Sequence, residues 1–185
     1  NQQGVCYALI GDNRYNSIFG ATNGCVCVNP SDTAPVLVAF GATIVTNQRQ
    51  VAAADFFDVK VAPNKSALTV LEEDEIVTEI QVPAPASGAK SAFVKFALRK
   101  AIDFPIVNCT AVIGGGSASI CLNAVSGKPR KATGAEEAIA GQTINDTNAA
   151  AAADAALQGA MSIGKNKYMI QIAKAMVKRA ILACA

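Results

Sequence analysis

The sequence contains no histidine and no tryptophan, and aromatic residues make up only 5% of it. Without histidine the chain cannot form a Ser-His or Cys-His nucleophile pair or a histidine-ligated metal site, which excludes most hydrolase mechanisms. The scarcity of aromatic rings argues against a platform on which nucleic-acid bases stack. A net charge of +2, with scattered Lys and Arg, also disfavours nucleic acid or a membrane surface as the partner.

Long apolar runs are absent as well. No run reaches the roughly 18 residues that would span a bilayer, and the N-terminal residues do not resemble a signal peptide. The 185 residues are 51% hydrophobic and 16% charged, which is typical of a folded chain with a substantial core. The length fits one domain or two small subdomains. Because the chain begins at Asn1 rather than at Met, we expect a processed protein or a piece of a longer polypeptide.

The six cysteines fall into two groups. Three lie in apolar stretches and are expected in the core, where a free Cys behaves as a small hydrophobe: Cys109, Cys121 and Cys184. A disulfide set would fit the count, but small disulfide scaffolds are denser in cysteine and less apolar than this chain. The other three lie in a Gly/Asn-rich segment without periodicity, where thiolates suit an iron–sulfur cluster: Cys6, Cys25 and Cys27.

Residue patterns predict short elements in the first half. We expect a loop over 1–30, a helix over 32–40, a hairpin over 43–52, a helical turn over 53–57 and strands over 68–71 and 76–82. Ser31 is a good N-cap and Gly41 a good C-terminal stop for the first helix, although a strand also fits its composition. Alternation over 76–82 indicates a half-buried strand. The Pro/Ala/Gly/Ser run 83–88 indicates a boundary between subdomains.

The second half predicts a sheet followed by helices. We expect strands over 91–100, 106–113 and 117–125, a glycine turn over 114–116, a basic loop over 128–133, and helices over 135–140, 148–159 and 166–183. The last helix carries one apolar stripe opposite Lys and Arg side chains, as a helix that covers a sheet face should. The fold class is therefore α+β, with a three-stranded antiparallel sheet and helices on one side.

Two further constellations can carry chemistry. Residues 29–32 (Asn-Pro-Ser-Asp) begin a helix, where free backbone N–H groups, a hydroxyl and a carboxylate can hold a sugar or polyol chain; the alternative is a simple helix cap. On a strand over 91–100, Lys95, Ala97 and Arg99 share one face. A cation held against a flavin ring can stabilise charge at its polar edge. The alternative is a solvated basic edge with an Arg99–Asp103 ion pair.

Three runs in a fixed order, 11–20, 30–39 and 93–107, resemble the flavin-binding medium subunit of the molybdenum hydroxylases. That family includes xanthine dehydrogenase, carbon monoxide dehydrogenase, nicotinate dehydrogenase, 4-hydroxybenzoyl-CoA reductase and bacterial aldehyde oxidoreductases. The tail, through 128–132, 136–138 and 165–182, is similar to the small C-terminal domain of that subunit. The resemblance implies that 1–85 is the second subdomain of a PCMH-type FAD-binding domain, without its N-terminal subdomain. It implies that 86–185 is the C-terminal sheet-plus-helices domain.

The resemblance also implies a cytoplasmic electron-transfer subunit with FAD as cofactor. Its partners would be a molybdopterin-binding large subunit and a [2Fe–2S] small subunit, and FAD would pass their electrons to NAD or another acceptor. The family's site residues carry over as follows: Ser31 and Asp32 at the ribityl or diphosphate part, Val77 near the isoalloxazine ring, Lys95 at its polar edge, and Asp103 and Ile106 lining the approach. The alternative function is a non-catalytic docking or scaffold module without its own FAD. A third reading is an unrelated α+β binding domain whose motifs match by chance.

The chain departs from the family at its glycine-rich phosphate loops. The first loop is not found before Asn1, and the second is replaced by 17–27. The contacts to the FAD phosphates are therefore expected from a separate chain or an upstream segment. The replacement resembles members with an additional [4Fe–4S] cluster. By that resemblance Cys6 and Cys25 are the candidate ligands, with Cys27 as a substitute. Tyr15 stands where one branch of the family has a ligand.

Overall fold

Antiparallel strands form three sheets in the computed structural model, which describes residues 6–62 and 65–185. The largest sheet has the order β6-β7-β8-β9, with β6 at Lys90–Phe96, β7 at Val107–Gly114, β8 at Ser117–Asn123 and β9 at Arg130–Lys131. The second has the order β2-β1-β5, with β2 at Gln50–Ala52, β1 at Thr43–Thr46 and β5 at Val77–Gln81. A third sheet pairs β3 (Phe57–Ala62) with β4 (Lys65–Thr69).

The largest sheet has one strand more than the sequence predicted. The two-residue β9 pairs Arg130 with Leu122 at the end of β8, inside the predicted basic loop. Two residues are too few for the alternation that marks a strand, so the pattern could not show it. The tight turn between β7 and β8 contains Gly115 and Gly116, whose φ angles of 60° and 78° suit glycine. Strand β6 also ends earlier than predicted, at Phe96.

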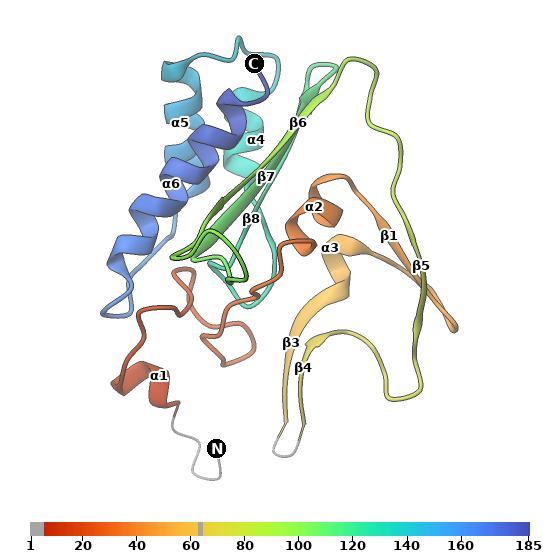
Figure 1. Cartoon of the computed structure of the whole chain (residues 1–185). Coiled ribbons are helices and arrows are strands. Elements are labelled where there is room, and N and C mark those ends of the chain that lie inside the picture. Colours follow the sequence, from red (N-terminus) through yellow and green to blue (C-terminus); the bar gives the residue numbers. More distant parts are fainter. Residues whose placement is uncertain (1–5, 63–64) are drawn as a thin grey trace.

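Three helices cover one face of this sheet (Figure 1). They are α4 (Thr133–Ile139), α5 (Asp146–Ala156) and α6 (Lys167–Leu182). The predicted stripe of α6 is confirmed, because Met169, Ala173 and Val177 are buried in the core cluster together with Cys109 and Cys184. None of the helices in the described ranges is long and apolar enough to cross a membrane.

A smaller cluster occupies the opposite face. Helices α2 (Ala34–Ala39) and α3 (Ala53–Phe56) pack there with β1, and Cys121 of β8 joins them (Figure 1). Gly41 follows α2 and its C-cap residue, and its φ of 65° is the left-handed conformation expected of a glycine that stops a helix. The predicted strand at 76–82 exists as β5, but its half-burial is wrong: Val77 is partly buried and the next four residues are exposed. Strand β3 was not predicted, and β4 begins before the expected 68–71.

Residues 13–29 lie against the C-terminal half of the chain. The predicted loop over 1–30 contains one short helix, α1 (Tyr7–Ile10), within its described residues. The Asn13 side chain donates to Ile163 O (2.9 Å) and accepts from the Lys165 N–H (2.7 Å). Ile18 is buried in the larger core cluster, and its N–H donates to Val125 O at 3.0 Å. These contacts bring the loop that precedes α2 to the end of the large sheet.

Candidate functional site

Two buried asparagines hold the start of α2 on the sheet. Asn108 of β7 and Asn123 of β8 are cross-strand partners, and both are fully buried. Their side-chain nitrogens donate to the same carbonyl, Ser31 O, at 3.1 and 2.7 Å. Asn123 also donates to Asn29 Oδ1 (3.2 Å), which in turn accepts from the Ser31 N–H (3.0 Å). The Asn-Pro-Ser-Asp turn is therefore anchored by neighbouring strands.

Lys95 lies at the exposed edge of this arrangement. Its ammonium donates to Asp32 Oδ2 at 2.6 Å and to the Asp103 carbonyl at 2.7 Å. The other oxygen of Asp32 accepts from the Asn108 side chain at 2.8 Å. The side chain of Lys95 keeps 25% of its surface exposed and that of Asp32 keeps 45%. The pair is thus ordered by the fold and still open to a ligand.

The loop 97–106 is closed by the Asp103 carboxylate. Asp103 accepts from the Arg99 N–H (2.8 Å), the Phe104 N–H (3.0 Å) and the Arg99 guanidinium (3.3 Å). The hydrogen bond from the Arg99 backbone, and then its guanidinium, lower the pKa of Asp103. The Arg99–Asp103 ion pair is confirmed. Because β6 ends at Phe96, the prediction that Ala97 and Arg99 share a strand face with Lys95 is wrong.

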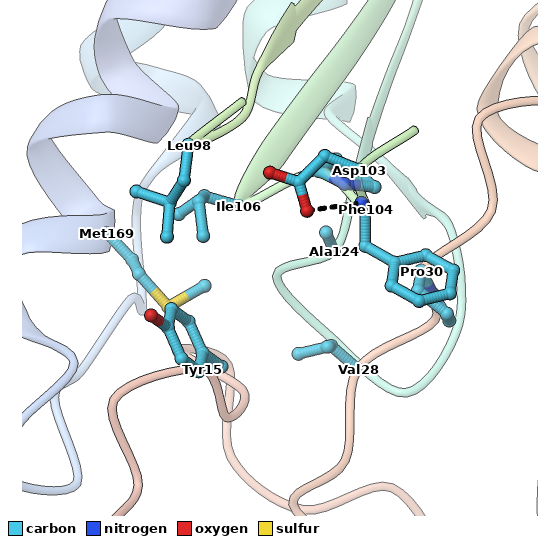
Figure 2. Close-up of a pocket in the computed structure, with 10 residues that line it drawn as sticks. Tyr15, Val28, Pro30, Leu98, Asp103, Phe104, Ile106, Ala124 and Met169 are labelled. Carbon is cyan, nitrogen blue, oxygen red and sulfur yellow. Dashed lines mark hydrogen bonds between the residues drawn. The ribbon is translucent and has the colours of Figure 1, made fainter. Parts of the chain in front are cut away.

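A mainly apolar cavity of about 340 Å³ opens beside this loop. Figure 2 shows the side chains of Tyr15, Met169, Leu98, Ile106 and Phe104 around it. The remaining lining residues are Val28, Pro30, Asp103, Pro105 and Ala124. A second, more polar hollow of about 710 Å³ is lined by Asp32, Lys95 and residues 97–103. Leu98 and Asp103 line both, so an apolar wall and a fixed cation meet at one place.

Four of the residues that the sequence singled out for a flavin site line these two hollows: Asp32, Lys95, Asp103 and Ile106. Ser31 lines a third hollow of about 520 Å³, which shares Asp32 and Asp103 with the second. Val77 lines none of the three. It pairs with Thr46 and packs against the smaller core cluster. Sequence reasoning missed Asn108 and Asn123. The signal that could have found Asn108 is an amide in the middle of the apolar run 106–113, where a polar side chain needs a partner.

Residues 92–184, half of the chain, match the family described as the CO dehydrogenase flavoprotein C-terminal domain. The chain belongs to this family. Among curated proteins, this chain is 34% identical to the carbon monoxide dehydrogenase medium chain of Hydrogenophaga pseudoflava, over 63% of its own length and 43% of that protein. It is 35% identical to the nicotinate dehydrogenase FAD-subunit of Eubacterium barkeri, over 47% of its length and 28% of that protein.

Solved structures agree with this membership. A chain of quinoline 2-oxidoreductase from Pseudomonas putida 86 superimposes on this chain with a TM-score of 0.71 and 27% identity, over 85% of this chain and 57% of that one. These relatives belong to oxidoreductases, and the α+β architecture predicted from the sequence is confirmed. The chain spans less than half the length of the two curated relatives that it matches.

The loop cysteines lie close together, but the described residues contain no arrangement that could hold a metal ion. Burial, and then a hydrogen bond with the Cys25 thiol, raise the pKa of Cys27 to about 11, and Cys6 is close enough to add to this effect. Among the described residues, no group of three or more Cys, Asp, Glu or His side chains has the arrangement to hold a metal ion. The predicted [4Fe–4S] ligands Cys6 and Cys25 therefore gain no support.

Proposed function

We propose that the chain is part of the FAD-carrying electron-transfer subunit of a multi-subunit molybdenum hydroxylase. The names of its relatives support the FAD-subunit role: one is a nicotinate dehydrogenase FAD-subunit and another a carbon monoxide dehydrogenase medium chain. In this proposal the partners are a molybdopterin-binding large subunit and a [2Fe–2S] small subunit. The electron acceptor is NAD or another carrier. Residues 1–85 belong to the FAD-binding domain and 86–185 to the C-terminal domain.

One observation supports the proposal most directly: the Lys95 ammonium is held between Asp32 and the Asp103 carbonyl, beside an apolar cavity. An isoalloxazine ring has a flat apolar body and a polar edge on which negative charge develops. Leu98, Phe104 and their neighbours offer an apolar wall, and Lys95 offers a cation of fixed position. The residues present therefore fit a flavin.

Each residue of the site has a role in this proposal. FAD, when bound, supplies the exchange between one-electron and two-electron carriers. Lys95 favours negative charge on the polar edge of the ring, and Asp32 keeps Lys95 in place. Ser31 and Asp32 also contact the ribityl or diphosphate part, where both can accept from ribityl hydroxyls and the Ser31 hydroxyl can donate to a phosphate oxygen. Asp103 and Ile106 shape the approach to the ring.

Val77 is assigned to the neighbourhood of the ring by the resemblance alone. It lies on β5, where it is partly buried, and thus offers an apolar surface to a ligand. In the proposal it meets the ring from the side opposite the large sheet. A Val77→Thr change, which keeps the shape and adds a hydroxyl, should alter the flavin absorption band if this contact exists. An unaltered band would remove Val77 from the site.

The experiment that tests the function is a visible absorption spectrum of the native complex, with FAD and iron assays. Stoichiometric FAD, with iron equal to that of the partner's [2Fe–2S] centres, would support the proposal and leave Cys6 and Cys25 without a metal role. Iron in excess, lost from a Cys25→Ser variant, would restore that role. An intact complex without FAD would overturn the flavoprotein assignment in favour of a docking or scaffold module.

A further inference from the structure

We propose that Asn108 and Asn123 are positioning residues, which set where Lys95 and Asp32 stand at the flavin site. This inference rests on the proposed function. The three side chains of Lys95, Asn108 and Asn123 form one cross-strand row, since Lys95 pairs with Asn108 and Asn108 pairs with Asn123. Paired residues project to the same face of an antiparallel sheet. The row therefore spans β6, β7 and β8 under the Asn-Pro-Ser-Asp turn.

The orientation of both amides follows from their partners. Asn108 Nδ2 contacts Ser31 O and Asp32 Oδ1, which are both acceptors. Asn123 Nδ2 contacts Ser31 O and an oxygen, Asn29 Oδ1, that already accepts from a backbone N–H. Turning either amide over would place oxygen against oxygen. Both side chains therefore act as donors toward the turn.

The side-chain oxygens of these two amides lower the stability of the fold. Asn108 Oδ1 and Asn123 Oδ1 are buried and have no hydrogen-bond partner in the part of the chain that the structure describes. A buried acceptor without a partner destabilises a fold, whereas an apolar pair of similar shape would not. Two such amides side by side on one face of a core sheet are thus unfavourable for stability. Their side-chain N–H groups, which donate to Ser31 and Asp32, indicate that the two amides serve the site rather than stability.

The two amides differ in what they reach. Asn108 contacts the Asp32 carboxylate, whose other oxygen holds the Lys95 ammonium, so it is one step from the cation. Asn123 contacts Asn29 and Ser31 but not the Asp32 side chain. Asn108 should therefore govern the position of the charge pair. Asn123 should govern the position of the turn that offers Ser31.

The test uses the native complex with Asn108→Leu and Asn123→Leu. Leu has nearly the shape of Asn and lacks the donor and the unpartnered oxygen. We expect each variant to fold with a melting temperature close to that of the wild type, because removal of the unpartnered oxygen offsets the donor that the Ser31 carbonyl loses. Asn108→Leu should shift the flavin midpoint potential and its absorption band, whereas Asn123→Leu should weaken FAD retention by about tenfold with a smaller shift in potential.

Thr110 provides the matched control. It lies two residues from Asn108 on the same strand, is buried, and its hydroxyl also has no partner among the described residues. Thr110→Val should leave FAD content and potential as in the wild type. If Thr110→Val shifts the potential as much as Asn108→Leu, general repacking explains the effect and the inference is overturned.

The remaining outcomes separate this inference from the function on which it rests. A wild-type complex that holds FAD, with no shift of the potential in Asn108→Leu and full FAD retention in Asn123→Leu, overturns the positioning role alone. A wild-type complex without FAD overturns the proposed function. If Asn108→Leu does not fold, Asn108→Ala gives the same measurement, because it removes the donor without adding volume.

Discussion

Lys95 and Asp32 are 63 residues apart in the sequence, yet their ammonium and carboxylate are joined at 2.6 Å. The contact links the edge strand of the large sheet to the turn that begins α2. It is completed by the Asp103 carbonyl on one side and by Asn108 on the other. A cation held by two acceptors, one of which is itself fixed by Asn108, loses little conformational freedom when a ligand arrives, which is the property that a flavin site requires.

Replacing Lys95 by Ala should change the flavin midpoint potential more than the stability of the fold. The charge beside the ring is removed, whereas a partly exposed ion pair contributes only about 0–1 kcal/mol to folding. Potentiometric titration and thermal unfolding of the complex measure the two effects. Lys178→Ala is the matched control. Lys178 on α6 forms an ion pair with Asp146 on α5 at 2.7 Å, and its side chain has a similar exposure of 31%. An unchanged potential in Lys95→Ala would exclude Lys95 from the site.

Asp32→Ala should weaken FAD retention by about 1–3 kcal/mol, the cost typical of leaving the partners of a charged hydrogen bond unpaired. Lys95 and Asn108 both lose an acceptor in this variant. The measurement is the fraction of FAD that remains after dialysis or gel filtration. Asp146→Ala, on the far side of the helical layer, should retain all of its FAD. Full retention in Asp32→Ala as well would contradict the role given to Asp32.

Asp103→Ala should loosen the loop 97–106. The carboxylate accepts hydrogen bonds from Arg99 and Phe104, and both are lost. Trypsin should then cleave after Arg99 or Lys100 several-fold faster, since protease access depends on local opening. Asp12→Ala is the control, because Asp12 makes the same kind of local contact with Arg14 outside this loop. Equal cleavage rates in both variants would show that Asp103 does not hold the loop.

Acid should lower the stability of the β2-β1-β5 sheet by protonating Glu75. Its carboxylate accepts from Arg49 at 2.8 and 2.9 Å, from the Glu72 N–H and from Thr46. The hydrogen bonds from Arg49, then that from Glu72, lower the pKa of Glu75 to about 2. The unfolded value is about 4.3. The folded pKa is thus the lower one, so this stabilisation is complete above about pH 4.3 and is lost as pH falls toward 2.

The comparison of wild type with Glu75→Gln isolates this carboxylate from the other acids. The variant should be less stable at pH 7, and the difference in the free energy of unfolding should shrink between about pH 4.3 and 2. Urea unfolding at a series of pH values measures it. A difference in the free energy of unfolding that stays constant across this pH window would show that protonation of Glu75 is not linked to folding.

Asn13→Ala should destabilise the chain by about 1–3 kcal/mol, because the Ile163 carbonyl and the Lys165 N–H both lose a partner. It should also displace Tyr15, which is two residues further along the chain and lines the apolar cavity. Thermal unfolding gives the first effect, and the quenching of Tyr fluorescence by added FAD gives the second. Asn148→Ala, which removes an exposed hydrogen bond to Thr143 O, should have a much smaller effect on stability.

Local patterns in the sequence were enough to predict much of the fold. The stripe of α6, the hairpin of β1 and β2, the strands β6 to β8 and the burial of Cys109 follow from periodicity and turn residues. The Arg99–Asp103 pair follows as well, since the two residues are four apart. The order of three short runs also indicated the family to which residues 92–184 are matched.

Only the tertiary structure decided how the site is assembled. The Lys95–Asp32 contact, the cross-strand pair Asn108–Asn123 and the meeting of Tyr15 with Met169 join residues far apart in the chain. Their distances depend on strand register and on how the N-terminal segment packs, which no local pattern encodes. The same reason explains the exposure of β5, whereas β9 was missed because its two residues are too few to show alternation. A residue's type determines which bonds it can make, and the fold determines which partner is within reach.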